Sequence, residues 1–286
     1  MHRLILATLL VTVSGCVVPN TELRDQPQIE RLRIQISKAR NAISETRAAI
    51  AEARGAPHLE ELYVRLGELM SDEAKYHYQV AYEREQRAGK ALNVPQVKFL
   101  KEQAVLVYEL VLRRYPKSKL ADRVLFNMGQ ELREIGNYKK MRESLERLAR
   151  DYPNSPLRPD ALLILGDDQF DRNKMDEAAG YYKQIVDGPK GRMTGLGHFK
   201  LAWVYVNQAE CKPALVNFEK ALIASEAYFG GPALKDDRRK NEGNLDVRRE
   251  ALVDLVYCYT HGENEKKNAL TGVPFLKKYA YNREHM

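Results

Sequence analysis

The sequence contains few of the residues that define several common classes of protein. Three cysteines in 286 residues are too few for a disulfide framework, and there is one tryptophan. Glycine and proline are also infrequent, at 17 and 12 residues. The chain is instead rich in Ala, Glu, Lys, Leu and Arg, which favours helices over an all-β fold or a polytopic membrane protein. A hydrophobic content of 44% excludes wholesale disorder.

The sequence also lacks an arrangement of residues that predicts a catalytic, metal or cofactor site. Its six histidines do not fall at metal-ligand spacings with carboxylates or thiols. The glycines at 191, 195 and 197 follow no strand pattern and have the wrong order for a dinucleotide-binding loop. The acidic run from Asp167 lacks the central glycine and final glutamate of a calcium loop. We therefore expect no enzymatic activity, cofactor or metal.

Positive charge exceeds negative charge, with 46 Lys and Arg against 39 Asp and Glu and a formal net charge of +7. The excess is spread along the chain rather than gathered in one basic stripe. It suits anionic partners generally but is too diffuse to predict binding to nucleic acid.

The first sixteen residues predict export and lipid anchoring. Arg3 precedes an apolar stretch over 4–13, and small residues then lead to Cys16. A transmembrane helix needs about 20 apolar residues, so the shorter run indicates a signal peptide over 1–15. Residues 13–16, Val-Ser-Gly-Cys, resemble the bacterial lipobox. This resemblance implies that Cys16 is acylated after cleavage, and two or more acyl chains anchor a protein stably to a bilayer.

Val17 follows the cysteine where a different sorting signal would carry Asp. By resemblance to the enterobacterial sorting rule, this implies the outer membrane, with the rest of the chain facing the periplasm. Exposure on the cell surface is the alternative.

A seven-residue repeat occupies residues 29–54, after a polar tether over 16–28. No proline or glycine interrupts it before Gly55. One edge of the repeat carries arginine every seven residues, from Arg33 to Arg54. The pattern predicts either a coiled coil that self-associates or one amphipathic helix packed on the rest of the chain. Self-association would use the four residues that recur seven apart: Ile29, Ile36, Ile43 and Ile50.

Three similar copies follow one another in the middle of the chain. Each contains a small residue, and these lie 37 and 36 residues apart, at Gly129, Gly166 and Ala202. Fixed intervals of 12, 16 and 19 residues lead from each small residue to three further positions. The sets at these positions are Met141, Ala178 and Ala214; Leu145, Tyr182 and Phe218; and Leu148, Ile185 and Ala221.

This pattern resembles the tetratricopeptide repeat (TPR) family, whose period is about 34 residues. The resemblance implies an all-α fold in which each copy is a pair of helices and the pairs stack into a solenoid. The small residue lets the two helices approach, and the larger residues fill the groove between them. Two copies end in a shared junction, Tyr115-Pro116-x-Ser118 and Tyr152-Pro153-x-Ser155.

These features together divide the chain into segments. We expect a heptad helix over 29–54, an irregular first repeat over 58–116 and three repeats over 120–224. A charged insertion over 225–247 and a degenerate last repeat over 248–286 would follow. In the first repeat, the long interval between Gly67 and Ala104 implies either a long first helix or an inserted loop near 89–95.

The junction on a lipidated precursor resembles the TPR lipoproteins of the bacterial envelope, such as those of the outer-membrane β-barrel assembly machinery and the Tol-Pal system. The resemblance implies a non-enzymatic scaffold that docks a protein partner in an envelope machine, which could equally serve gliding motility or secretion. The alternative is an envelope lipoprotein that binds peptidoglycan or another glycan, with or without cleavage activity.

The resemblance also implies which residues line the inner groove of the solenoid, because the groove positions of the family can be read onto each copy. They place four aromatic side chains along one groove, flanked by charges of both signs, as peptide recognition favours. The alternative is that the heptad helix or the C-terminal segment of the chain covers them. The candidate groove residues are Arg123, Phe126, Gln130, Arg133, Asp167, Phe170, Phe199, Trp203, Val206 and Asn207. Cys211 and Cys258 are expected to be buried free thiols, with a disulfide between them as the alternative.

Overall fold

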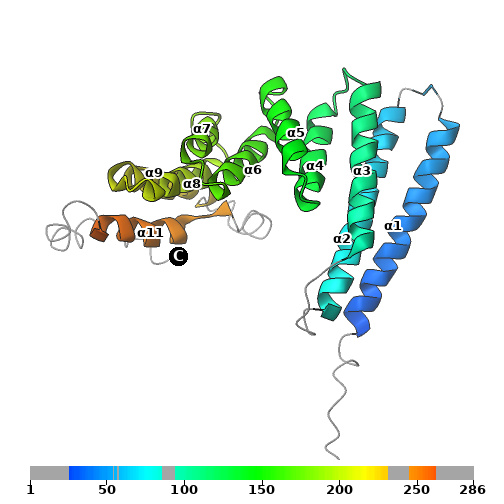
Figure 1. Ribbon diagram of the computed structural model, residues 1–286, viewed down its shortest axis with the longest axis horizontal. Helices are drawn as coiled ribbons and strands as arrows, with labels where there is room; N and C mark the ends of the chain where they lie inside the picture. Colours follow the sequence, from blue (N-terminus) through cyan, green and yellow to red (C-terminus); the bar gives the residue numbers. More distant parts are fainter. Residues whose placement is uncertain (1–25, 54, 57, 86–93, 231–244, 262–286) are drawn as a thin grey trace, which may run out of the picture.

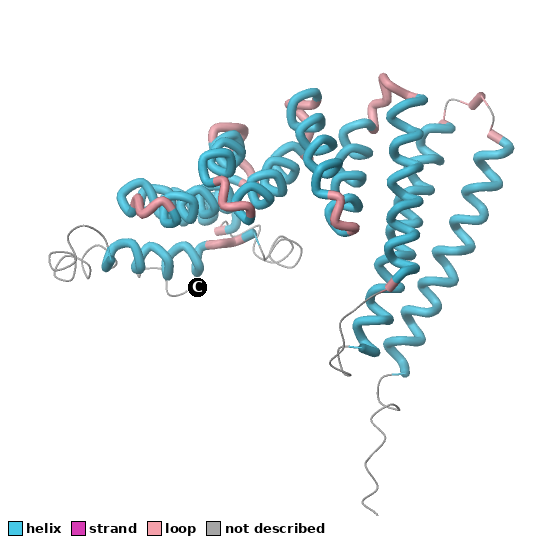
Figure 2. Tube along the Cα trace, viewed as in Figure 1, coloured by secondary structure: helices cyan, strands magenta, loops and turns pink. Residues whose placement is uncertain are grey.

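The computed structural model describes residues 26–53, 55–56, 58–85, 94–230 and 245–261 (Figure 1). All the regular structure within these ranges is helical, and Figure 2 shows helices joined by short loops. The all-α fold class is therefore confirmed. The helices are α1 (Gln26–Glu52), α2 (Leu59–Glu85), α3 (Pro95–Arg114), α4 (Ala121–Glu134), α5 (Tyr138–Asp151), α6 (Arg158–Asp171), α7 (Met175–Val186), α8 (Thr194–Asn207), α9 (Cys211–Phe229) and α11 (Arg248–His261).

Successive helices pack in pairs: α2 with α3, α4 with α5, α6 with α7, and α8 with α9. We call the earlier helix of each pair its first helix and the later one its second helix. Helix α11 continues the series by packing on α9, and α1 precedes it by packing on α2. Figure 1 shows α1, α2 and α3 side by side at one end of this series and α8, α9 and α11 at the other.

In the first three pairs, a glycine of the first helix meets a large buried residue of the second helix. A Cβ added at Gly67 would lie 2.5 Å from Cε1 of Tyr108, and one added at Gly129 would lie 2.5 Å from Cδ2 of Leu145. At Gly166 it would overlap the ring of Tyr182. These large side chains are at most 1% exposed, so close packing depends on the missing methyl group.

The turn between the helices of a pair is the same in three copies. Gly136, Asn173 and Ala209 each have a positive φ, of 80°, 59° and 59°. Glycine adopts this left-handed conformation freely, whereas alanine pays roughly 1–2 kcal/mol for it. After glycine, asparagine is among the residues that adopt this conformation most readily, so Asn173 also suits the turn, whereas Ala209 does not.

The Tyr-Pro-x-Ser junctions connect one pair to the next. The hydroxyl oxygen of Ser118 accepts a hydrogen bond from the backbone N–H of Leu120 at 3.0 Å. Ser155 does the same for Leu157 at 3.2 Å, and its hydroxyl donates to Oδ2 of Asp122 at 2.6 Å. Each serine therefore holds the chain at the start of the following helix.

The isoleucine heptad packs inside the chain. Ile36 and Ile43 are 8% and 6% exposed, and Ile43 belongs to one cluster with Val64, Met70 and Tyr108 of α2 and α3. Of the two alternatives for this helix, the structure has the second: an amphipathic helix on the rest of the chain. A tethered α2 is always present at high effective concentration, so it occupies this apolar face in cis.

The irregular first repeat contains a long first helix. Helix α2 has 27 residues and runs through Tyr76, Tyr78 and Tyr82, and α3 has 20. At the other end, α9 continues to Phe229, past the predicted start of the charged insertion at 225. Phe229 is 1% exposed and its ring packs edge-on against Tyr228, which explains the extra turn.

Several expectations concern residues outside the described ranges. They are the signal peptide, Cys16 and most of the tether, the loop at 89–93, most of the charged insertion, and 262–286 of the last repeat. Within the described residues, no helix is both long and apolar enough to span a bilayer.

The glycine contact gives a test with a matched control. Gly166→Ala forces the buried Tyr182 ring to move, and overpacking of this kind costs about 1–3 kcal/mol. The same substitution at Gly180, an exposed position of α7 where a Cβ would meet nothing within 4 Å, should stabilise the chain by about 0.4–1 kcal/mol. Thermal unfolding followed by circular dichroism should show shifts of opposite sign. Equal midpoints for the two variants would contradict the contact's role.

A buried ion pair joins the first two helix pairs. Nζ of Lys101 in α3 lies 2.7 Å from carboxylate oxygens of both Glu131 and Glu134 in α4. Burial by itself lowers the pKa of Lys101, but the hydrogen bonds to these two carboxylates outweigh it and the pKa lies above its usual 10.5. The pair's contribution to stability is therefore complete at neutral pH and is lost only as the pH rises through that raised value.

Removing one partner of this pair should be costly. Lys101→Met leaves the buried carboxylate of Glu131 uncompensated, so unfolding by urea should show a loss of about 3–5 kcal/mol. The double variant Lys101→Met/Glu131→Leu should recover most of that loss, because no buried charge remains. A single variant as stable as the original chain would refute the assignment.

Candidate partner-binding face

The first helices of successive pairs lie next to one another and form one face of the solenoid. Arg123 of α4 makes an ion pair with Glu68 of α2. Nζ of Lys200 in α8 lies 3.0 Å from Oδ1 of Asp167 in α6. The indole Nε1–H of Trp203 in α8 donates to Oδ2 of Asp254 in α11 at 3.0 Å. We call this surface, made by α2, α4, α6, α8 and α11, the inner face.

The four predicted groove aromatics fall into two groups. Phe170, Phe199 and Trp203 all pack, half-buried, against the hydrophobic cluster of the last helices, as does Val206. Phe126 is also half-buried but packs against a different cluster, around α4 and α5. Phe199 and Trp203 both contact the ring of Phe218, while Phe170 packs against the same cluster and Phe126 against the neighbouring one.

Trp203 serves the solenoid itself. Its ring meets Phe218 edge-on, with centroids 6.4 Å apart and an interplanar angle of 87°, and its N–H is bound to Asp254. Burial raises the pKa of the Asp254 carboxyl, and the hydrogen bond from Trp203 works in the opposite direction. Trp203 therefore fastens α11 to α8, and the polar edge of its indole is already used within the chain.

Asp167 is also used within the chain. Its Oδ1 accepts a hydrogen bond from the hydroxyl of Tyr182 at 2.7 Å, in addition to the ion pair with Lys200. Burial raises the pKa of Tyr182 far above 10, and the negative charge of Asp167 raises it further. The hydroxyl thus stays protonated, and Asp167 links α6 to both α7 and α8.

The remaining predicted groove residues are more accessible. Arg133 is exposed near the end of α4, and Gln130 is half-buried one turn earlier. Asn207 is exposed at the end of α8, where its side-chain amide donates to the backbone carbonyl of Trp203 at 2.8 Å. Exposed Arg133, Arg123 and Asn207, with the half-buried rings of Phe126 and Phe170, are what the inner face offers to a partner.

Sequence reasoning missed the residues that pair with the groove positions: Glu68, Lys200 and Asp254. Glu68 and Asp167 both lie one residue after the small residue of their copies, and each pairs with a basic residue in the next first helix. The basic partners do not share a repeat position, because Arg123 lies six residues before Gly129 and Lys200 two residues before Ala202. An alignment of the copies therefore gives no signal for these contacts.

The remaining side chains that could in principle react or bind a metal, two cysteines and a histidine, have structural roles. Cys211 and Cys258 are free thiols; Cys258 is fully buried, and burial together with the neighbouring Cys211 raises its pKa to about 12. Burial lowers the pKa of His198, whose Nδ1 lies 3.0 Å from Oδ1 of Asn217. Across the described ranges, no three or more His, Cys, Asp or Glu side chains are grouped so that they could hold a metal ion.

Comparison with known families places the tetratricopeptide repeat on the copy formed by α4 and α5, where the family matches residues 123–155. Comparison with curated protein sequences gave no significant match. Among solved structures, BtubC (BKLC) from P. vanneervenii is similar, with a TM-score of 0.56 and 18% identity over 89% of this chain and 94% of its own.

A tetratricopeptide repeat protein from Parabacteroides merdae matches less well, with a TM-score of 0.44 and 16% identity over 91% of this chain and 95% of its own. Pseudomonas aeruginosa pilF gives a TM-score of 0.36 at 16% identity, over 81% of this chain and 97% of its own. The likeness to BtubC concerns the fold alone. The fold is an all-α solenoid of the tetratricopeptide type, and such solenoids generally act as non-enzymatic scaffolds for protein interactions.

Proposed function

We propose that this protein is a non-enzymatic scaffold of the bacterial envelope that docks a protein partner on its inner face. The observation that carries the proposal is that some side chains of that face are engaged within the chain while others remain accessible. Asp167 and Trp203 hold the helices together, while Arg133, Asn207 and the half-buried ring of Phe170 remain at the surface. Rigid aromatic edges beside exposed polar groups suit recognition of a peptide segment.

The location is part of the same proposal. The lipobox-like residues before Cys16 support acylation of that cysteine, and Val17 after it supports the outer membrane. A lipid anchor of two or more acyl chains would hold the solenoid at the membrane, with the repeats facing the periplasm. The partner would then belong to an envelope machine for outer-membrane assembly, Tol-Pal function, gliding motility or secretion.

Photo-crosslinking in cells tests the inner face. A photoreactive residue at position 133 or 207 should give a covalent adduct with a protein partner, because both side chains are exposed on this face. The matched control is position 143, which is also exposed but lies on α5, a second helix. Adducts of equal yield from 143, or none from 133 and 207, would refute the proposal.

A substitution on the same face measures how much one side chain contributes to the free energy of partner binding. Phe170→Ala should weaken partner binding by about 2 kcal/mol, or about 30-fold, because the substitution removes a rigid aromatic anchor. The crosslinking yield from position 133 should fall accordingly. Because Phe170 also packs against the core, unchanged circular dichroism of the variant is the necessary control.

Metabolic labelling tests the anchor separately. Cells grown with a clickable fatty acid should label the original chain and place it in the membrane fraction. Cys16→Ser should abolish both the label and the membrane association, because no acceptor thiol remains at the cleavage site. An unlabelled original chain recovered from the soluble periplasm would contradict lipid anchoring and leave the inner-face proposal standing.

A further inference from the structure

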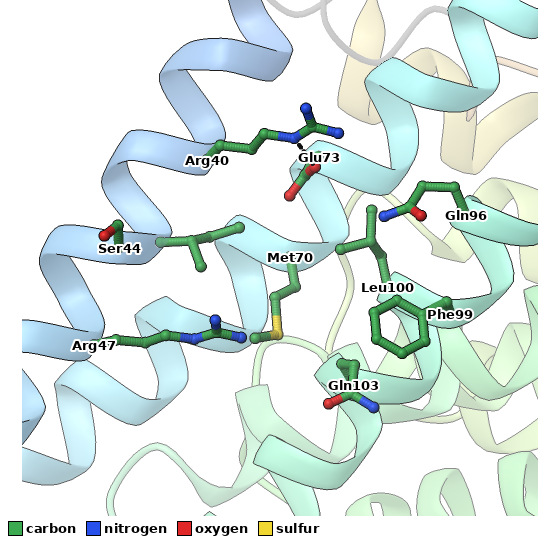
Figure 3. A pocket seen from close by; sticks show the side chains of 10 residues that line it. Arg40, Ser44, Arg47, Met70, Glu73, Gln96, Phe99, Leu100 and Gln103 are labelled. Carbon is green, nitrogen blue, oxygen red and sulfur yellow. Dashed lines mark hydrogen bonds and ion pairs between the residues drawn. The ribbon is translucent and has the colours of Figure 1, made fainter.

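Helices α1 and α3 flank an open hollow of about 320 Å³ at one end of the series (Figure 3). In this hollow, Nε of Arg40 in α1 lies 2.7 Å from Oε1 of Glu73 in α2, so the buried carboxylate is engaged within the chain. The other end of the series brings together two groups that can react with each other. They are the thiols of Cys211, the first residue of α9, and Cys258 in α11.

Two contacts hold one side of α11 against the preceding helix pair. The indole N–H of Trp203 in α8 donates to Oδ2 of Asp254 at 3.0 Å. The thiols of Cys211 and Cys258 are hydrogen-bonded to each other. Asp254 and Cys258 are four residues apart and therefore lie on the same side of α11. The contact between the thiols is thus part of the way α11 packs on α8 and α9.

The two thiols differ in accessibility. Cys258 is fully buried in the hydrophobic cluster of the last helices, whereas Cys211 is half-buried and packs against that cluster. Burial, together with the neighbouring Cys211, raises the pKa of Cys258 to about 12, so this thiol is protonated at neutral pH. A disulfide reagent that approaches the chain therefore meets Cys211 first, and Cys258 is in place to react second.

We propose that Cys211 and Cys258 form a redox-responsive disulfide that joins α11 covalently to α9. In the first step, the Cys211 thiolate attacks a disulfide RS–SR, which gives a mixed disulfide and releases RS⁻. In the second step, Sγ of Cys258 attacks Sγ of Cys211, and the remaining RS group leaves with the proton of Cys258. The protein loses two electrons and two protons, and the disulfide RS–SR becomes two thiols.

The bond acts on the last helix of the inner face. It closes a loop that contains all of α9, and such a link restricts the states in which α11 is detached. Reduction leaves α11 to its non-covalent contacts, among them the hydrogen bond from Trp203. Oxidation in the cell rests on the proposed envelope location, because disulfides form and persist in compartments such as the bacterial periplasm. The pairing of the two thiols does not rest on it.

The pairing is tested on the purified full chain carrying Cys16→Ser, so that the lipid anchor plays no part. The chain is treated with oxidised glutathione and unfolded, and its free thiols are labelled with a polymer-linked maleimide. We expect two labels on the reduced chain and none on the oxidised monomer, with a peptide that joins Cys211 to Cys258. Any label on the oxidised monomer, oxidation only to a dimer, or absence of the joined peptide would overturn the proposal.

Single variants test the order of attack. Cys258→Ala should leave a stable glutathione adduct on Cys211, because the thiol that resolves the mixed disulfide is gone. Cys211→Ala should leave Cys258 without an adduct after the same time, because that thiol is fully buried. The reverse pattern of adducts would overturn the assigned roles. Circular dichroism should show unchanged helix content for both variants, and the pairing test does not depend on either.

Hydrogen exchange tests the link between α9 and α11. Oxidation should slow the exchange of the α11 amides about ten-fold or more, because the helix is then tied to α9 when it opens. The amides of α4, in a pair that the bond does not touch, are the internal control and should not change. Equal exchange of α11 in the oxidised and reduced chains would overturn the role of the bond in holding this helix.

The state of the thiols in cells tests the oxidation itself. Cells that express the original chain are quenched with acid, and free thiols are blocked before lysis. We expect Cys211 and Cys258 to be joined in untreated cells and free after a reductant is added. Thiols that join in the purified chain but are free in untreated cells would overturn the proposed envelope location. Failure of the purified chain to form the bond would overturn the pairing and leave that location standing.

Discussion

The structure depends on one contact that three successive helix pairs repeat: a glycine in the first helix against a large buried side chain of the second. Gly67 meets Tyr108, Gly129 meets Leu145 and Gly166 meets Tyr182 at distances that leave no room for an added methyl group. This contact sets how closely the two helices of a pair approach. Since the pairs stack on one another, the same spacing propagates along the chain and determines where the first helices lie.

Apolar stacking alone does not fix the position of one helix pair on the next. Polar contacts between the pairs restrict that position further. Lys101 connects α3 to α4, Asp167 connects α6 to α8, and Trp203 connects α8 to α11. A side chain that accepts or donates at a fixed geometry permits fewer relative positions than apolar packing does. The inner face is consequently built from two kinds of residue. Some of its polar groups hold the solenoid together, and the rest are free to meet a partner, which restricts recognition to the remaining exposed groups.

The isoleucine heptad of helix α1 packs within the chain, so it does not indicate association between chains. A heptad of isoleucines is compatible with a coiled coil between chains, but α2 covers Ile36 and Ile43 first. What remains of α1 for other molecules is its arginine edge. On α3 the same logic leaves Phe99 and Leu106 exposed, because Tyr108 and Ala104 already supply the packing with α2. The surface available for association is thus what intramolecular packing does not use.

The sequence by itself determined the local and periodic features of this protein. Helical composition, the spacing of Gly129, Gly166 and Ala202, and their large partners 16 residues later were sufficient for the fold class, because these interactions recur at fixed separations along the chain. The tertiary structure decided which groove residues are available and which are engaged. Trp203 and Asp167 have partners 51 and 33 residues away in neighbouring copies, Asp254 and Lys200, whose proximity follows only from the stacking of pairs. A periodic pattern specifies a residue's place within its own repeat, whereas its neighbours across repeats depend on the packing of the whole solenoid.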